Sequence, residues 1–140
     1  MISFGYEDVD WRLDGEDEVA AWATLVLRQQ GFTPSAITVV FCSDEHLLYL
    51  NKTYLNHDYF TDILTFNYTE GPSTELVGDL FISIDTVRSN AGEYSASFID
   101  ELHRVIIHGM LHLAGHDDQT DAAKATMRHQ EDVALNLRMF

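Results

Sequence analysis

The feature that most constrains the fold of this chain is the stretch of residues 105–114, in which every residue is apolar except His108 and His112. A stretch of this length is too short to span a bilayer, so we expect it to lie in a helix of a globular protein. Gly115 follows it directly and predicts the end of the helix. Ser97 is suited to cap the start, so we predict one long helix over residues 97–114.

The spacing of apolar residues elsewhere predicts both helices and strands. Helical spacing indicates helices at 16–30, from 43 onward, at 85–92 and from 120 onward, whereas β-branched and aromatic runs indicate strands at 37–42, 63–68 and 78–84. We expect Asp14, Asp85 and Thr120 to cap their helices, and the last two strands to pair as a hairpin. The chain has 140 residues, 46% of them hydrophobic, which suits one domain with a sizeable core. About five helices and at least three strands predict an α+β fold in a single domain over residues 1–140.

The two histidines of the long helix are four residues apart, so their imidazoles lie on one face and can share a metal ion. After the glycine turn, the returning chain can bring His116, Asp117 or Asp118 to the same ion. Two helical histidines and one further ligand leave an open coordination position, as in a catalytic zinc site. Zinc is our first choice, and nickel or another divalent ion fits the same donors. The alternative is a buried histidine pair bonded to backbone carbonyls.

A metallopeptidase is one enzyme class that binds zinc through a similar pattern. In the peptidase motif H-E-x-x-H, a glutamate follows the first histidine and acts as the general base. Gly109 stands at that position here, so the usual proton acceptor is missing. A peptidase is therefore disfavoured and is kept as an alternative.

Four ordered blocks resemble a different family. They are L-N-x-x-Y, T-D-x-L-x-F, G-D-x-x-I-S-x-D and H-G-x-L-H-L-x-G-x-D-x, at residues 50–54, 61–66, 78–85 and 108–118. Together they resemble the YbeY family of bacterial metal-dependent, single-strand-specific endoribonucleases. The resemblance implies a mixed β-sheet of about four strands packed with about five helices, and an enzyme that hydrolyses RNA. It also implies a role in maturing the 3′ end of small-subunit rRNA and in late ribosome quality control.

The chain departs from the family at the third metal ligand. The family's usual ligand is a histidine six residues after the second histidine, and Asp118 occupies that position here. Because a carboxylate is a competent zinc ligand, we predict one zinc ion per chain, bound by His108, His112 and Asp118. His116 is the competing third ligand.

A second departure is Leu55, where many relatives have an arginine thought to engage RNA phosphate near the metal. Arg104 lies one helical turn before His108 on the same face, so we predict that Arg104 supplies the missing positive charge as a catalytic residue. It would do so by contacting a phosphate or by pairing with an acid. The alternative is a purely structural ion pair, with Asp100 or Glu101 as its partner.

Three further acids have less specific patterns. Asp62 and Asp79 lie in the resembling blocks and are expected to orient ligands or to cap turns. Asp117 is near enough in sequence to be considered as the general base. None of the three is predicted to bind the metal in preference to Asp118.

The charge of the chain constrains how it meets a substrate. Lys and Arg number 8 against 23 Asp and Glu, a formal net charge of −15, so a broad phosphate-binding surface is excluded. We therefore expect single-stranded rRNA to be delivered by the small ribosomal subunit or an assembly factor, with no membrane partner. The lone Cys42 and the absence of a secretory signal favour the cytoplasm. The opposing function is a non-catalytic assembly factor whose metal only stabilises the turn after Gly115.

Overall fold

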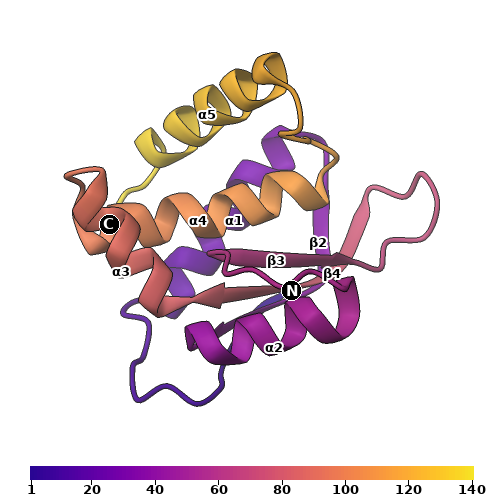
Figure 1. Ribbon diagram of the computed structural model, residues 1–140. Helices are drawn as coiled ribbons and strands as arrows, with labels where there is room; N and C mark the ends of the chain where they lie inside the picture. The colour runs from indigo at the N-terminus through magenta and orange to yellow at the C-terminus, as the bar shows by residue number, and fades with distance from the viewer.

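Nine elements make up the fold in the computed structural model, which describes residues 1–140 (Figure 1). The strands are β1 (Ile2–Tyr6), β2 (Thr33–Cys42), β3 (Ile63–Asn67) and β4 (Glu75–Ser83), and the helices are α1 (Glu16–Gln29), α2 (Asp44–Leu55), α3 (Ile84–Glu93), α4 (Phe98–Leu113) and α5 (Asp121–Asn136). None of the helices is both long and apolar enough to cross a membrane. The predicted α+β class, with four strands and five helices, is confirmed.

The four strands form one mixed sheet in the order β1-β2-β4-β3. β2 is parallel to both β1 and β4, whereas β3 and β4 run antiparallel as the predicted hairpin. Strand β1 is missing from the sequence prediction, because its five residues include a glycine and its pairing is with a strand 35 residues later. Such a non-local parallel pairing leaves no turn signal in the sequence.

The helices cover the two faces of this sheet unequally. Figure 1 shows α1 and α4 on one face, α5 outside α4, and α2 alone on the opposite face. The main core lies under α1 and α4, and α4 supplies much of its apolar surface. A smaller cluster around Leu47, Cys42 and Leu64 seats α2 on the other face. Helix α4 is thus enclosed by the sheet, by neighbouring helices and by α5, which explains its apolar sequence.

Two glycines allow α4 to lie close to the sheet. A Cβ atom at Gly109 would come within 2.7 Å of Ile63 Cδ1 and 2.8 Å of Leu80 Cδ1. A Cβ atom at Gly78, in β4, would come within 2.6 Å of the Phe66 carbonyl oxygen and 2.8 Å of Leu113 Cδ2. The absence of a peptidase glutamate at position 109 therefore has a packing reason: that side chain would point into the sheet.

Most of the predicted helix caps are confirmed, and two are wrong. Thr120 accepts a hydrogen bond from Ala123 N and caps α5, as expected. Asp14 does not cap α1, because Gly15, with a left-handed backbone, occupies the cap position. Asp85 does not cap α3 either, since the Ser83 hydroxyl accepts the capping bond. Ser83 lies two residues before Asp85 and is the last residue of β4, so the strand runs directly into the helix.

Candidate metal centre and its cleft

His108 and His112 occupy one face of α4, at the edge that is not covered by the sheet. Their ring centroids are 5.3 Å apart, and their side chains are 22% and 33% exposed. Helix α4 ends at Leu113, and Gly115, just beyond its C-cap, has a φ of 100°, a left-handed conformation that favours glycine. The chain then reverses along the outside of the helix, as the glycine signal predicts.

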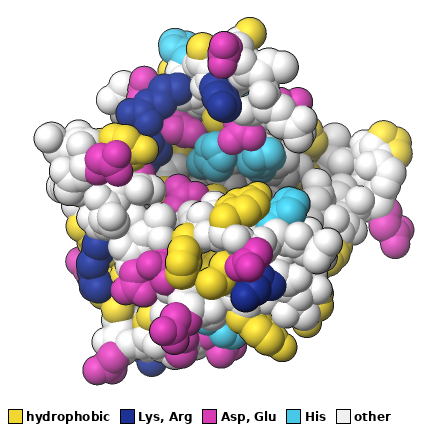
Figure 2. Space-filling view, in the orientation of Figure 1, with side chains coloured by type: hydrophobic (Ala, Val, Ile, Leu, Met, Phe, Trp, Pro, Cys, Tyr) yellow, Lys and Arg dark blue, Asp and Glu magenta, His cyan; other side chains and the backbone are white.

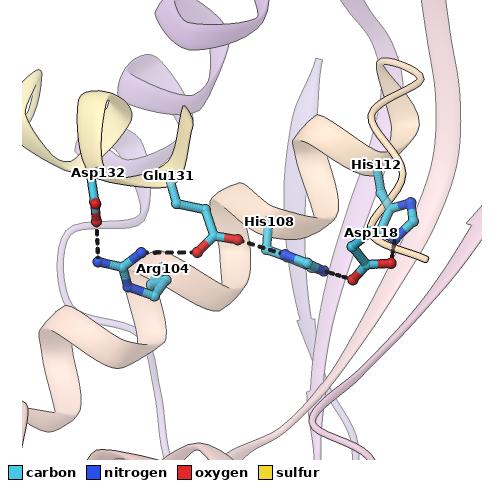
Figure 3. Close-up of polar contacts among 6 residues, drawn as sticks. All are labelled: Arg104, His108, His112, Asp118, Glu131 and Asp132. Atoms are coloured by element: carbon cyan, nitrogen blue, oxygen red, sulfur yellow. Dashed lines mark hydrogen bonds and ion pairs between the residues drawn. The ribbon is translucent and has the colours of Figure 1, made fainter. Parts of the chain in front are cut away.

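This reversal brings Asp118 to both histidines (Figure 3). Asp118 Oδ2 is 3.4 Å from His108 Nε2, and Asp118 Oδ1 is 3.4 Å from His112 Nε2. Tetrahedral zinc with bonds of about 2.0–2.1 Å holds neighbouring ligand atoms about 3.3 Å apart. One ligand atom from each of these residues lies within 4.8 Å of the others, so the donors fit a single divalent ion.

The competing ligand, His116, points elsewhere. Its Nε2 is 2.7 Å from Gln30 Oε1, on the segment that follows α1. Asp117 caps the turn, because its Oδ1 accepts a hydrogen bond from Gln119 N. The structure therefore groups His108, His112 and Asp118, and it leaves His116 and Asp117 outside that group.

Glu131, in α5, is a site residue that the sequence analysis missed. Its Oε2 is 2.7 Å from His108 Nδ1, so the ring nitrogen donates to the carboxylate and leaves Nε2 facing Asp118. A carboxylate in this position fixes the tautomer and the orientation of a metal-binding histidine. The signal in the sequence is that Glu131 lies on the same face of α5 as the buried Met127 and Ala134. A glutamate on a buried helix face needs a partner.

Arg104 extends the same network away from the metal ligands. Its Nη1 is 2.9 Å from Glu131 Oε1 and its Nη2 is 2.6 Å from Asp132 Oδ1. The ion pair that we considered exists, but the expected partners were wrong: Asp100 pairs with Arg138 instead. The phosphate contact stays a prediction. Because both terminal nitrogens already donate to carboxylates, the geometry favours an action through Glu131.

These contacts change the protonation of the groups around the centre. Burial lowers the pKa of His108, but the hydrogen bond and charge of Glu131, with Asp118 and Asp62, outweigh burial and raise the pKa overall. Burial raises the pKa of the Asp62 carboxyl, and His108 partly offsets that effect. Asp62 lines the cavity that also contains His108, His112 and Asp118, and it is therefore part of the electrostatic surroundings of His108.

The metal-ligand group lies in the wall of an open cleft. Figure 2 shows two histidine side chains at the bottom of a hollow, with basic side chains along one rim and hydrophobic side chains along the other. A cavity of about 600 Å³ joins the three ligands to α2 and to the loop before β3, including Leu55, His57 and Tyr59. The site is thus reachable from solvent and is bordered by one largely uncharged wall.

A second cavity, of about 390 Å³, opens on the other side of His108 and Asp118. Its wall carries Arg104 together with Lys124 and Arg128 of α5. The whole chain has only 8 basic residues, and three of them gather here. The same wall also carries the acids Asp62, Glu101, Asp118 and Glu131, so the three cations offset the acidic side chains locally without making the wall positive as a whole.

Fold and site together define a class: an α+β protein with a His-His-Asp group of metal-ligand spacing in an open cleft, as metal-dependent hydrolases have. The family model described as "Endoribonuclease YbeY" matches residues 6–138. The chain belongs to the YbeY family of endoribonucleases.

Individual relatives agree over nearly the whole length. The protein named "Endoribonuclease YbeY" from Cytophaga hutchinsonii is 42% identical over 139 residues, covering 99% of this chain and 96% of the relative. Its namesake from Bacteroides thetaiotaomicron is 47% identical over 121 residues, covering 86% and 87%. The solution structure of TM1509 from Thermotoga maritima matches with a TM-score of 0.67 and 25% identity, over 97% of this chain and 87% of that one. The predicted family is confirmed.

Proposed function

We propose that residues 1–140 form one metal-dependent hydrolase domain that cleaves single-stranded RNA, and that its substrate in the cytoplasm is the 3′ end of small-subunit rRNA. The observation that carries the proposal is the convergence of His108, His112 and Asp118 in an open cleft. Family membership supports the RNA substrate, because the relatives are named endoribonucleases. A role in ribosome quality control follows from the same resemblance.

The proposed metal is one zinc ion, held by two imidazole nitrogens and a carboxylate oxygen. This donor set suits zinc, although nickel and other divalent ions share it. When bound, such an ion lowers the pKa of a coordinated water and polarises a phosphate oxygen. The side chains of this protein supply the remaining functions.

Glu131 and Arg104 act as positioning residues in this proposal. Glu131 accepts the Nδ1 proton of His108, so that Nε2 keeps its lone pair for the metal. Arg104 donates to the other oxygen of Glu131 and holds that carboxylate in place. In this proposal the positive charge of Arg104 therefore acts on Glu131, which contacts the metal ligand His108, and not directly on the metal.

Lys124 and Arg128 are better placed than Arg104 to contact phosphate. Both are exposed, neither forms an ion pair, and both border the cavity that contains His108 and Asp118. We propose that they replace the family arginine that is absent at Leu55. Two cations bind naked RNA only weakly, so a partner on the small ribosomal subunit or an assembly factor would deliver the strand.

The alternative of a non-catalytic assembly factor needs a closed structural site with four protein ligands. The natural fourth ligand, His116, is bonded to Gln30, and no fourth histidine, cysteine or carboxylate joins the group. The open arrangement thus supports a catalytic site.

The test is metal analysis of the purified protein joined to a cleavage assay on a single-stranded rRNA fragment. Wild type should carry about one zinc per chain and cut the fragment. His112→Ala should lose metal and cleavage together, whereas His129→Ala, an exposed histidine of α5, should lose neither. A wild type that binds metal and cuts nothing would favour the assembly factor. A wild type without metal would overturn both proposals.

A further inference from the structure

Exposed aromatic side chains gather on the loop that forms one wall of the cleft. Tyr59 is 54% exposed and Phe60 is 61% exposed, and His57 is exposed beside them. Large apolar rings left in water carry an unfavourable hydration free energy, so a group of them beside a functional cleft indicates a binding surface.

His57 and Tyr59 form an ordered pair. Their rings are stacked with centroids 5.2 Å apart and an interplanar angle of 21°, and Tyr59 Oη is 3.1 Å from His57 Nδ1. The buried Asn51 of α2 holds the backbone beneath them: its side-chain Nδ2 donates to Tyr59 O, and its backbone carbonyl oxygen accepts from His57 N. The pair is therefore preorganised before any ligand binds.

The same pair borders the cavity that contains His108, His112 and Asp118. This wall offers no free cation, because no lysine or arginine lines the cavity and Lys52 is paired with Asp58, with 3.4 Å between Nζ and Oδ1. A phosphate would find little attraction here. A flat aromatic ligand would find a stacking surface.

We propose that the His57–Tyr59 pair is a base-stacking platform for one nucleotide of a single strand bound across the metal centre. This inference rests on the proposed endoribonuclease function. Stacking of a base on an aromatic side chain contributes about 1–3 kcal/mol and needs no positive charge on the protein. It therefore suits a chain with a net charge of −15.

The platform also provides a physical basis for a preference for single strands. A base in a duplex has both faces covered by its neighbours, so it cannot reach a side chain without unstacking. A single strand exposes those faces. In the bound strand, the base would contact Tyr59 on one wall while the phosphates approach Lys124 and Arg128 on the other.

The test compares two labelled strands of equal length and charge, a single-stranded oligoribonucleotide and an abasic version of it. Binding of the full-length protein is measured by fluorescence anisotropy in the presence of chelator, which prevents cleavage. Tyr59→Leu should weaken binding of the normal strand by about 5- to 150-fold and leave binding of the abasic strand unchanged. Tyr59→Phe, which keeps the ring, should stay within about twofold of wild type.

Tyr49→Leu is the matched control, because Tyr49 is 61% exposed on α2 and is not among the residues that line either cavity of the metal centre. Equal loss of binding in Tyr49→Leu and Tyr59→Leu, or equal affinity of wild type for both strands, would overturn the platform. Wild type that binds neither strand and cuts no RNA when loaded with zinc would overturn the proposed function itself. An unchanged circular dichroism spectrum shows that each variant is folded.

Discussion

His108 Nδ1 lies 2.7 Å from Glu131 Oε2, and this contact joins two helices that are separated by the metal-binding turn. Glu131 is 5% exposed, and its second oxygen accepts from Arg104. The contact thus fixes the orientation of the His108 ring through Nδ1, the nitrogen that does not face Asp118. It also attaches α5 to α4, in addition to the apolar contacts that Met127 and Ala134 make with the core.

We therefore predict that Glu131→Gln weakens zinc binding by about 10- to 100-fold, since the amide cannot hold the imidazole as a carboxylate does. Affinity is measured by competition with a chromophoric chelator. Asp132→Asn is the matched control, because Asp132 also bonds Arg104 but does not contact His108. Equal affinities for the two variants would contradict the positioning role of Glu131.

A second prediction separates the two candidates for the third ligand. Asp118→Ala should lose most of the bound metal, because its carboxylate is 3.4 Å from the Nε2 atoms of both His108 and His112. His116→Ala should retain about one metal per chain, since His116 is bonded to Gln30. Elemental analysis of both proteins after dialysis decides the point. Metal loss confined to His116→Ala would reverse the assignment.

A third prediction concerns Lys124 and Arg128. Each contact with a phosphate of a single strand adds about 0.7 to the slope of log affinity against log salt concentration, so Lys124→Ala and Arg128→Ala should each lower the slope by about that amount. Arg28→Ala, an exposed arginine that lines neither cavity of the metal centre, should leave it unchanged. The slopes come from anisotropy titrations at several salt concentrations. The Tyr59→Leu variant should change the affinity without changing the slope.

The sequence predicts the elements of this fold well where the signals are local. The apolar residues of α4 repeat at helical spacing, Gly115 ends the helix, and Thr120 starts the next one, so these elements are found close to their true bounds. Strand β1 depends on pairing with β2, a contact between distant residues. The caps of α1 and α3 differ from the prediction because Gly15, one residue after Asp14, and Ser83, two residues before Asp85, occupy the cap positions.

The candidate site shows the same division. The spacing of His108 and His112 predicts a shared metal, and the glycine turn predicts that a later residue returns to it. The choice between Asp118 and His116 depends on the path of the turn, which spacing does not encode. Glu131 comes from another helix, and only the packing of α5 on α4 reveals its role.

A fourth prediction is a pH dependence of stability that arises from His103, away from the metal centre. Burial and the adjacent Arg138 lower its pKa to about 4, and Arg138 Nη1 donates to its Nδ1. In the unfolded chain the imidazole has a pKa of about 6.5. Between about pH 4 and pH 6.5 the unfolded state therefore binds more protons than the folded state. The contribution of His103 to the free energy of unfolding is therefore fully present above about pH 6.5 and is lost as the pH decreases toward 4.

Between about pH 7.5 and about pH 5, His103 should contribute a loss of about 2 kcal/mol in the free energy of unfolding. The measurement is urea denaturation at both pH values in the presence of chelator, so that metal binding does not contribute. His103→Gln keeps an acceptor for Arg138 but does not titrate, and should show a smaller loss. Parallel losses in the two proteins would show that other groups dominate.

The last prediction tests the close approach of α4 to the sheet by making the same substitution, glycine to alanine, at Gly78 and, as a control, at Gly92. Gly78→Ala places a methyl group 2.6 Å from the backbone oxygen of Phe66 and 2.8 Å from Leu113 Cδ2, so β3 or the end of α4 must shift. Such overpacking costs about 1–3 kcal/mol. Gly92→Ala, in α3, meets nothing within 4 Å and gains up to about 1 kcal/mol from helix propensity. Urea denaturation should therefore give changes of opposite sign for the same substitution, and two changes of the same sign would contradict the packing explanation of Gly78.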